Sequence, residues 1–180
     1  MRIIILIILI LFTCIYINKI NDIQGTDLQG TDQQGTDHYG VIAYINYKTD
    51  EKNYVNGQFT GLKWQCVEYA RRWLIQVKGI IIEDVETAED LWKLKTVTSI
   101  NGKTYKFMNV TNGIPPVGSL LIYKKTNKYP FGHVAVIVDV HENGEIDIAE
   151  QNYSLEKWKG YSRRITMKDS DILGWKIIKE

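Results

Sequence analysis

The sequence predicts an α+β domain in which a helix near the start of the domain packs against an antiparallel sheet. Hydrophobic residues make up 44% of the 180 residues and charged residues 24%, a composition typical of a globular protein. Apolar residues recur at steps of three and four from Val67 to Val77, as in an amphipathic helix. Beyond residue 115, short β-branched runs are separated by turn residues, as in an antiparallel sheet.

The first 20 residues form an apolar leader, in which Arg2 precedes an almost unbroken apolar run that starts at Ile3. The run is slightly shorter than the roughly 20 residues that usually span a bilayer, and no Ala-x-Ala cleavage signal follows it. We therefore expect residues 1–20 to be an uncleaved anchor that places the protein at a membrane. A cleaved signal peptide, which would make the protein secreted, is the alternative.

A polar segment from residue 21 to residue 38 follows the leader. It contains the tetrapeptide QGTD three times between Gln24 and Asp37. The repeat is too short and too polar to bury an apolar face, and glycine with small polar residues favours a flexible chain. We expect this segment to be a spacer, with the folded domain occupying residues 39–180.

Within the domain, the helix that begins near residue 66 is expected to end at Gly79, which suits the position just past a helix end. A second short helix follows, capped by Asp84 or Thr87. The polar residues 50–61, with two glycines, are expected to form a loop, and Asn143-Gly144 predicts a tight hairpin turn. Strands are expected at residues 40–47, 119–123, 133–141, 145–152 and 172–178.

Charge and cysteine content exclude several classes of function. The net charge of +1 provides no strong basic field for binding nucleic acid. Cys14 lies in the leader, so Cys66 is the one cysteine of the expected domain. Neither a disulfide framework nor a cysteine-rich metal site is therefore expected.

Cys66 falls at the first turn of the expected helix. Unpaired N–H groups and the helix dipole stabilise a thiolate there and lower the thiol pKa from about 8.5. We therefore interpret Cys66 as a nucleophile. The side-chain amide of Gln65 and the Cys66 N–H would form an oxyanion hole. The alternative for Gln65 is a solvated residue at the helix start.

His133 is the histidine best placed to act as general base for Cys66. It opens an expected strand, whereas His38 lies in the spacer and His141 adjoins the hairpin turn. A histidine at a strand edge can direct its ring towards a facing helix. Pairing it with the cysteine of the domain predicts nucleophilic catalysis.

A general base of this kind needs a third group on its second ring nitrogen. Pairing across a two-residue turn at 143–144 puts His133, Glu150 and Asn152 on one face of the sheet. The same register places Glu150 opposite Ile137, far along the strand from His133. The register by itself favours Asn152, and it leaves Glu150 open if a bulge or a different turn intervenes.

Three motifs resemble those of the CHAP domain, a cysteine- and histidine-dependent amidohydrolase/peptidase family with a papain-like fold. They are WQCVEYARRW at residues 64–73, GHVAVI at 132–137 and IAEQN at 148–152. The stretches around them are similar to the amidase domains of glutathionylspermidine synthetase/amidases and of trypanothione-making relatives. The resemblance extends from about Gly40 to Trp175 and implies a papain-like fold, with the cysteine on a helix and the histidine on the sheet.

The resemblance implies a role for each matching residue. Cys66 matches the nucleophile, His133 the general base and Glu150 the residue that orients the histidine. Asn152 matches a further polar residue counted with them, and Gln65 a donor to the oxyanion. On this ground Glu150 is favoured over Asn152.

Arg71 matches an arginine that holds the glutathione part of the substrate; from the residues alone, a solvated helix face is its alternative. The resemblance implies an amidase that hydrolyses a glutathionylspermidine-like conjugate through a thioester. No metal or organic cofactor is implied. The chain shows no match to the ATP-dependent synthetase domain, so hydrolysis and not synthesis is expected. Hydrolysis of peptide bridges in peptidoglycan and a non-catalytic, membrane-tethered binding protein are the alternatives.

Overall fold

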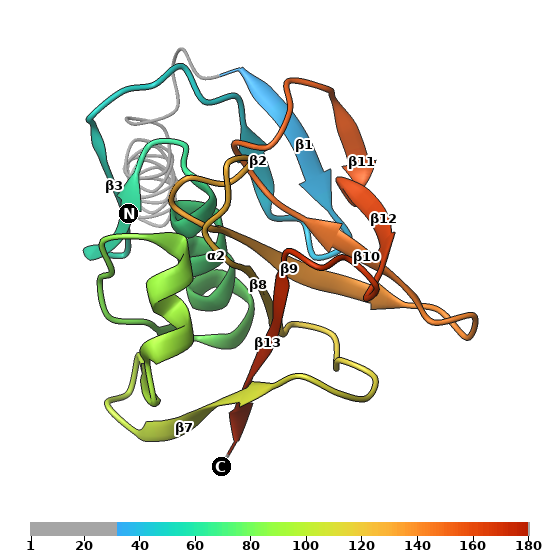
Figure 1. Ribbon diagram of the computed structural model, residues 1–180. Coiled ribbons are helices and arrows are strands. Elements are labelled where there is room, and N and C mark those ends of the chain that lie inside the picture. The colour runs from blue at the N-terminus through green and yellow to red at the C-terminus, as the bar shows by residue number, and fades with distance from the viewer. Residues whose placement is uncertain (1–31, 180) are drawn as a thin grey trace, which may run out of the picture. The chain divides into compact units, whose positions relative to one another are not determined.

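The structure is a computed structural model that describes residues 32–179. Its largest feature is a sheet of eight strands (Figure 1). Its strands are β5 (Ile80–Ile81), β6 (Thr96–Ser99), β7 (Thr104–Val110), β8 (Leu120–Tyr123), β9 (His133–Val140), β10 (Glu145–Ala149), β12 (Arg163–Thr166) and β13 (Ile172–Lys179). They lie in the order β12-β10-β9-β8-β13-β7-β6-β5. All neighbouring pairs are antiparallel.

Two smaller sheets complete the strands of the described residues. One contains β1 (Gln33–Asp37), β2 (Ile42–Tyr44) and β11 (Trp158–Gly160) in the order β11-β1-β2, with β1 parallel to β11. The other is a hairpin of β3 (Lys52–Val55) and β4 (Gln58–Leu62). The expectation of a loop at 50–61 is therefore wrong. The sequence does not reveal the hairpin, because the strands on either side of its Asn-Gly turn are too short to show an alternating pattern.

The helix α2 (Cys66–Trp73) packs against β9 and β4 (Figure 1). It continues as the π-helical turn η1 (Leu74–Lys78) and ends at Gly79, whose φ of 63° is left-handed. This is the helix end that the sequence predicts, because glycine takes that conformation without a steric cost. The second short helix is the 3-10 helix η2 (Ala88–Lys93), preceded by Thr87.

The central strands β8 and β9 are buried on both faces. Leu120 and Val134 belong to an apolar cluster that includes the inner face of α2. Leu121 and Ala135 belong to a second cluster that includes Trp175 of β13. Burial on both faces explains the nearly continuous apolar sequence of β9, since neither face has to be polar.

The spacer predicted for residues 21–38 is wrong for its last part. Gln33–Asp37 form β1, and the third QGTD copy therefore belongs to the folded domain. Asp37 accepts hydrogen bonds from Tyr69 Oη at 2.8 Å and Trp73 Nε1 at 2.7 Å, which ties this copy to α2. The domain accordingly begins before residue 39. The buried donors of Tyr69 and Trp73 would lose their hydrogen-bond acceptor without Asp37.

The apolar leader and the first two QGTD copies, apart from Asp32, lie outside the described residues. Among the helices of residues 32–179, none is both long and apolar enough to cross a membrane.

Candidate active site

Cys66 is the first residue of α2, and its side chain is buried with 8% of its surface exposed. Gln65 precedes it in extended conformation (φ −77°, ψ 161°), so the chain turns into the helix directly before the thiol. The first N–H groups of a helix have no acceptor within it, and they point towards the region of the sulfur. This local arrangement is the one predicted from the helix start.

The environment of Cys66 favours the thiolate. Burial by itself would raise the thiol pKa, but the charge and hydrogen bond of His133, with the backbone N–H groups of Val134 and Val67, outweigh burial and lower the pKa. A thiolate is the nucleophilic form of cysteine. The structure therefore brings together the nucleophile and base that the sequence proposes.

His133 opens β9 and is 3% exposed. Its ring stacks on Tyr129 at 5.5 Å between centroids, with an interplanar angle of 21°. Gly132 precedes it with φ 71°, and a Cβ there would lie 2.8 Å from Glu89 N. Glycine at this position thus lets the loop pass close to η2 and turn His133 into the site.

Glu150 is the group that contacts the second nitrogen of this histidine. Its Oε2 lies 2.7 Å from His133 Nε2, and both side chains are buried. Because Nε2 is engaged by Glu150, Nδ1 is the ring nitrogen left for Cys66. The third group of the site is therefore adjacent to the histidine, as the resemblance implies and the simple hairpin register does not.

Two features of the β9–β10 pairing bring Glu150 towards His133. The loop spans residues 142–144 and not 143–144 alone, because His141 and Glu145 are already hydrogen-bonded at 2.8 Å. A β-bulge before Ile148 then shifts the register by one more residue, so that Ile148 pairs with residue 137 instead of residue 138. The expectation of a two-residue turn is therefore wrong, and the corrected register moves Glu150 along β9 towards the histidine.

The ionisation of the pair follows from its surroundings. Burial would lower the pKa of His133, but Cys66 and Glu150 together raise it to about 10. Burial would raise the pKa of Glu150, but His133 and Arg163 lower it to about 2. These shifts together favour the thiolate of Cys66, the imidazolium of His133 and the carboxylate of Glu150.

Asn152 contacts Gln65 and not the histidine. Its Nδ2 donates to Gln65 Oε1 at 2.6 Å, and its backbone has a φ of 58°, which asparagine tolerates better than most residues. With Oε1 used as an acceptor, Gln65 Nε2 is left to donate. Asn152 thus orients the side-chain amide of Gln65, which is a different contact from the one with His133 that the simple register favours.

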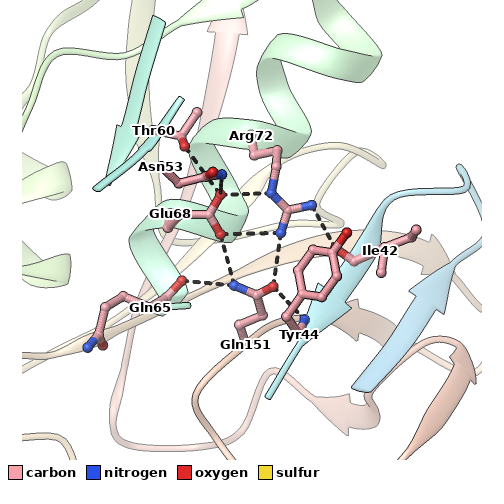
Figure 2. Close-up of polar contacts among 8 residues, drawn as sticks. All are labelled: Ile42, Tyr44, Asn53, Thr60, Gln65, Glu68, Arg72 and Gln151. Carbon is pink, nitrogen blue, oxygen red and sulfur yellow. Dashed lines mark hydrogen bonds and ion pairs between the residues drawn. The ribbon is translucent and has the colours of Figure 1, made fainter. Parts of the chain in front are cut away.

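A buried polar network connects α2 with the end of β10 (Figure 2). Glu68 is paired with Arg72 at 2.7 Å, and both side chains are nearly or fully buried. Gln151 donates from Nε2 to Glu68 at 2.9 Å and to the backbone oxygen of Gln65 at 3.3 Å, and Figure 2 shows its amide between the two. Consecutive residues after β10 thus contact His133, the start of α2 and the Gln65 side chain.

A cleft of about 370 Å³ opens over Cys66 and His133. Its walls come from the start of α2, the residues before η2, the loop before β9 and the residue Asn152. Two oppositely charged side chains, Glu86 and Lys128, also line it, and both are exposed. The cleft therefore has room for a substrate beside the thiol and carries both signs of charge.

Arg71 is placed differently from its expectation. It does not line the cleft. Its guanidinium is buried, pairs with Asp84 at 2.9 Å and donates to Ile82 O at 3.0 Å. In this arrangement its donors join α2 to the segment before η2, so a contact with a substrate carboxylate stays a prediction that this geometry does not support.

Two residues of the site gave no signal in the sequence. Arg163 binds the Glu150 carboxylate through both oxygens, at 2.6 and 3.1 Å. Gln151 has an unremarkable side chain within IAEQN, yet it is fully buried in the network of Figure 2. Both act through contacts with distant strands or helices, and no local pattern identifies such contacts.

One cluster among the described residues could bring three ligand atoms of a metal ion together: His38, Asp139 and Asp147, within 4.8 Å of one another. Arg164 already donates to both oxygens of Asp147, at 2.7 and 3.0 Å. A guanidinium bound in this way competes with a cation for the same carboxylate. The donor set is therefore poorly suited to a metal, and it lies outside the cleft residues.

The chain is similar in sequence to known proteins. Trypanothione synthetase of Crithidia fasciculata is 34% identical over 140 residues, which are 75% of this chain and 21% of that protein. Bifunctional glutathionylspermidine synthetase/amidase of Escherichia coli (strain K12) is 33% identical over 150 residues, 72% of this chain and 24% of that protein. The chain thus matches about a quarter or less of the length of these relatives.

The crystal structure of Ly7917 is similar with a TM-score of 0.44 and 16% identity, covering 63% of this chain and 53% of that one. The model of the CHAP domain family matches residues 57–152, which include Cys66, His133, Glu150 and Asn152 and make up more than half of the chain. The chain therefore belongs to the CHAP domain family.

Proposed function

We propose that the protein is a cysteine-dependent amidase that hydrolyses an amide bond through a thioester. The observation that carries the proposal is the buried Cys66–His133–Glu150 arrangement at the floor of a cleft. Thiol, imidazole and carboxylate in this order are the groups that nucleophilic acyl transfer requires. Membership of the CHAP domain family supports the same class of reaction.

In the first half-reaction the Cys66 thiolate attacks the carbonyl carbon and the carbonyl oxygen becomes an oxyanion. In this proposal, Gln65 Nε2 and the N–H of Cys66 at the helix start donate to this oxygen. His133 gives its proton to the nitrogen of the leaving amine as the C–N bond breaks, and a thioester remains.

In the second half-reaction His133 takes a proton from water, and the resulting hydroxide attacks the thioester. The C–S bond breaks, the carboxylic acid leaves, and the thiolate and imidazolium are restored. Glu150 keeps the ring in the tautomer that presents Nδ1 to the sulfur, and it stabilises the imidazolium.

For the substrate, we propose a conjugate of a peptide acid with a polyamine, of the glutathionylspermidine type. Similarity to the bifunctional glutathionylspermidine synthetase/amidase of Escherichia coli supports this class. So do the charges of the cleft, because such a conjugate carries both ammonium and carboxylate groups that Glu86 and Lys128 can bind. We further propose that residues 1–20 hold the enzyme at a membrane.

The test is an assay of the full chain, purified in detergent, with glutathionylspermidine and separately with peptidoglycan. Release of new amines is followed, and Cys66→Ala is the control. Cleavage of the conjugate by wild type alone is expected. Cleavage of peptidoglycan alone would keep the mechanism and replace the substrate. A wild-type protein that is folded yet cleaves neither would favour the non-catalytic binding protein.

A further inference from the structure

We propose that Arg163 is a positioning residue of this active site, which holds the Glu150 carboxylate in the orientation that binds His133. The proposal rests on the amidase function proposed above. Arg163 lies on β12, the edge strand next to β10. Its Nε donates to Glu150 Oε1 at 2.6 Å and its Nη2 to Glu150 Oε2 at 3.1 Å. Oε2 is also the atom that contacts His133, so three charged groups form one chain.

The two-point contact fixes the plane of the carboxylate. A guanidinium presents its donors in a rigid fork that matches both oxygens, whereas an ammonium acts as a single point charge. Ser162 Oγ supplies one more donor, to Oε1 at 3.2 Å. Without Arg163, Glu150 would keep fewer donors and could rotate away from the ring nitrogen of His133.

Arg163 is itself held in place by aromatic side chains. The Cζ atom lies 3.6 Å from the centroid of the Tyr153 ring, and Nη2 lies 3.4 Å from Tyr123 Oη. Tyr153 follows β10 and Tyr123 ends β8, so two segments restrict the guanidinium. Contacts from two sides therefore hold the guanidinium of Arg163 in one position, as expected of a group that positions a catalytic side chain.

Arg163 also adds a fixed positive charge next to the reacting pair. Other titratable groups near His133 and Glu150 are Cys66 from α2, Tyr123 from β8, Tyr129 from the loop before β9 and Tyr153 after β10, and Lys128 lines the same cleft as His133. A nearby cation stabilises a thiolate. Loss of Arg163 should consequently raise the pKa of Cys66. It should lower the pKa of His133, because a Glu150 carboxylate that rotates away no longer stabilises the imidazolium.

The test measures the rate at which iodoacetamide alkylates Cys66 in the full chain as a function of pH. Mass spectrometry of the peptide that contains Cys66 keeps Cys14 out of the measurement. In Arg163→Met, the lower pKa of the profile, that of Cys66, is expected to rise and the upper pKa, that of His133, to fall, each by about half to one pH unit. Arg163→Lys keeps the charge but loses the fork, so its profile should stay close to wild type while kcat falls about tenfold.

The matched control is Arg164→Met, one residue along the same strand. Arg164 binds Asp147 through both oxygens, at 2.7 and 3.0 Å, in the same way as Arg163 binds Glu150. Its loss removes the same kind of ion pair but should leave the Cys66 profile and kcat unchanged. A Cys66 profile in Arg163→Met that equals wild type, or an equal shift in Arg164→Met, would overturn the proposal.

Failure of this proposal can be told apart from failure of the proposed function. Alkylation needs no substrate, so a wild type that cleaves neither substrate would refute the amidase function while the profiles still decide the role of Arg163. If Arg163→Met does not fold, Arg163→Lys carries the test: kcat equal to wild type in that variant overturns the positioning role.

Discussion

Replacing Glu68 by glutamine is expected to lower the free energy of unfolding by about 3–5 kcal/mol, because it leaves the Arg72 guanidinium buried without its counter-ion. Glu68 has no exposed surface and Arg72 has 5%. The carboxylate accepts from Arg72 at 2.7 and 3.2 Å and from Gln151 at 2.9 Å (Figure 2). A glutamine amide keeps the volume, but its NH2 group would face donors or displace them.

The same carboxylate has further partners that increase the cost. Asn53 Nδ2 donates to it at 2.8 Å and Thr60 Oγ1 at 3.3 Å. Each buried donor that loses its acceptor costs about 1–3 kcal/mol, so the total should stay near the upper part of the range even if the network partly rearranges. For a domain of this size the corresponding fall in Tm is roughly 10 °C.

Urea unfolding of the full chain measures the effect through the midpoint at an unchanged m-value. The matched control is Glu51→Gln, because Glu51 also pairs with a basic residue, Lys63, at 3.2 Å but is 70% exposed. Its loss should cost less than about 1 kcal/mol. A Glu68→Gln protein as stable as the control protein would refute the reasoning. A Glu68→Met/Arg72→Met double variant should lose less free energy of unfolding than the two single variants together, because no charge is left buried without its partner. A larger loss in the double variant would also refute the reasoning.

Acid is expected to destabilise the protein through Glu150: with its pKa lowered from 4.5 to about 2, its contribution is complete above pH 4.5 and is lost as the pH falls towards 2. The unfolding free energies of wild type and Glu150→Gln should therefore converge at low pH, and a constant difference would contradict this. Lys176 behaves in the opposite pH range: burial lowers its pKa from 10.5 to about 8, so its unfolded form binds more protons between those values and stability rises with pH there. Urea titrations of Lys176→Met should lack this rise; an identical rise in the variant would assign it to other groups. Gly35→Val should destabilise by more than about 2 kcal/mol, because a Cβ at this position would lie 2.2 Å from the Trp158 ring. Thr36→Val is its control, and equal melting temperatures of the two variants would rule out the clash.

The helix that carries Cys66 could be predicted because its signals are local. The three- and four-residue spacing, the terminal Gly79 and the position of the cysteine at the first turn all depend on neighbours in the sequence. The same holds for β9, whose apolar run reflects burial on both faces. By contrast, the strand in the third QGTD copy could not be predicted. Its glycine and polar residues favour a flexible chain, and only the buried donors Tyr69 and Trp73 make Asp37 part of the fold.

The sequence by itself determined the chemistry that the protein can perform: one thiol at a helix start, one histidine at a strand start, and carboxylate and amide groups after the next strand. Tertiary structure decided which of these groups meet. The loop is one residue longer than expected, and a β-bulge precedes Ile148. Together they bring Glu150 into contact with His133, while Asn152 contacts Gln65. Arg163 enters the site because β12 pairs with β10. The physical reason is that register and burial arise from the packing of distant segments, whereas propensities and helix-end effects act over a few residues.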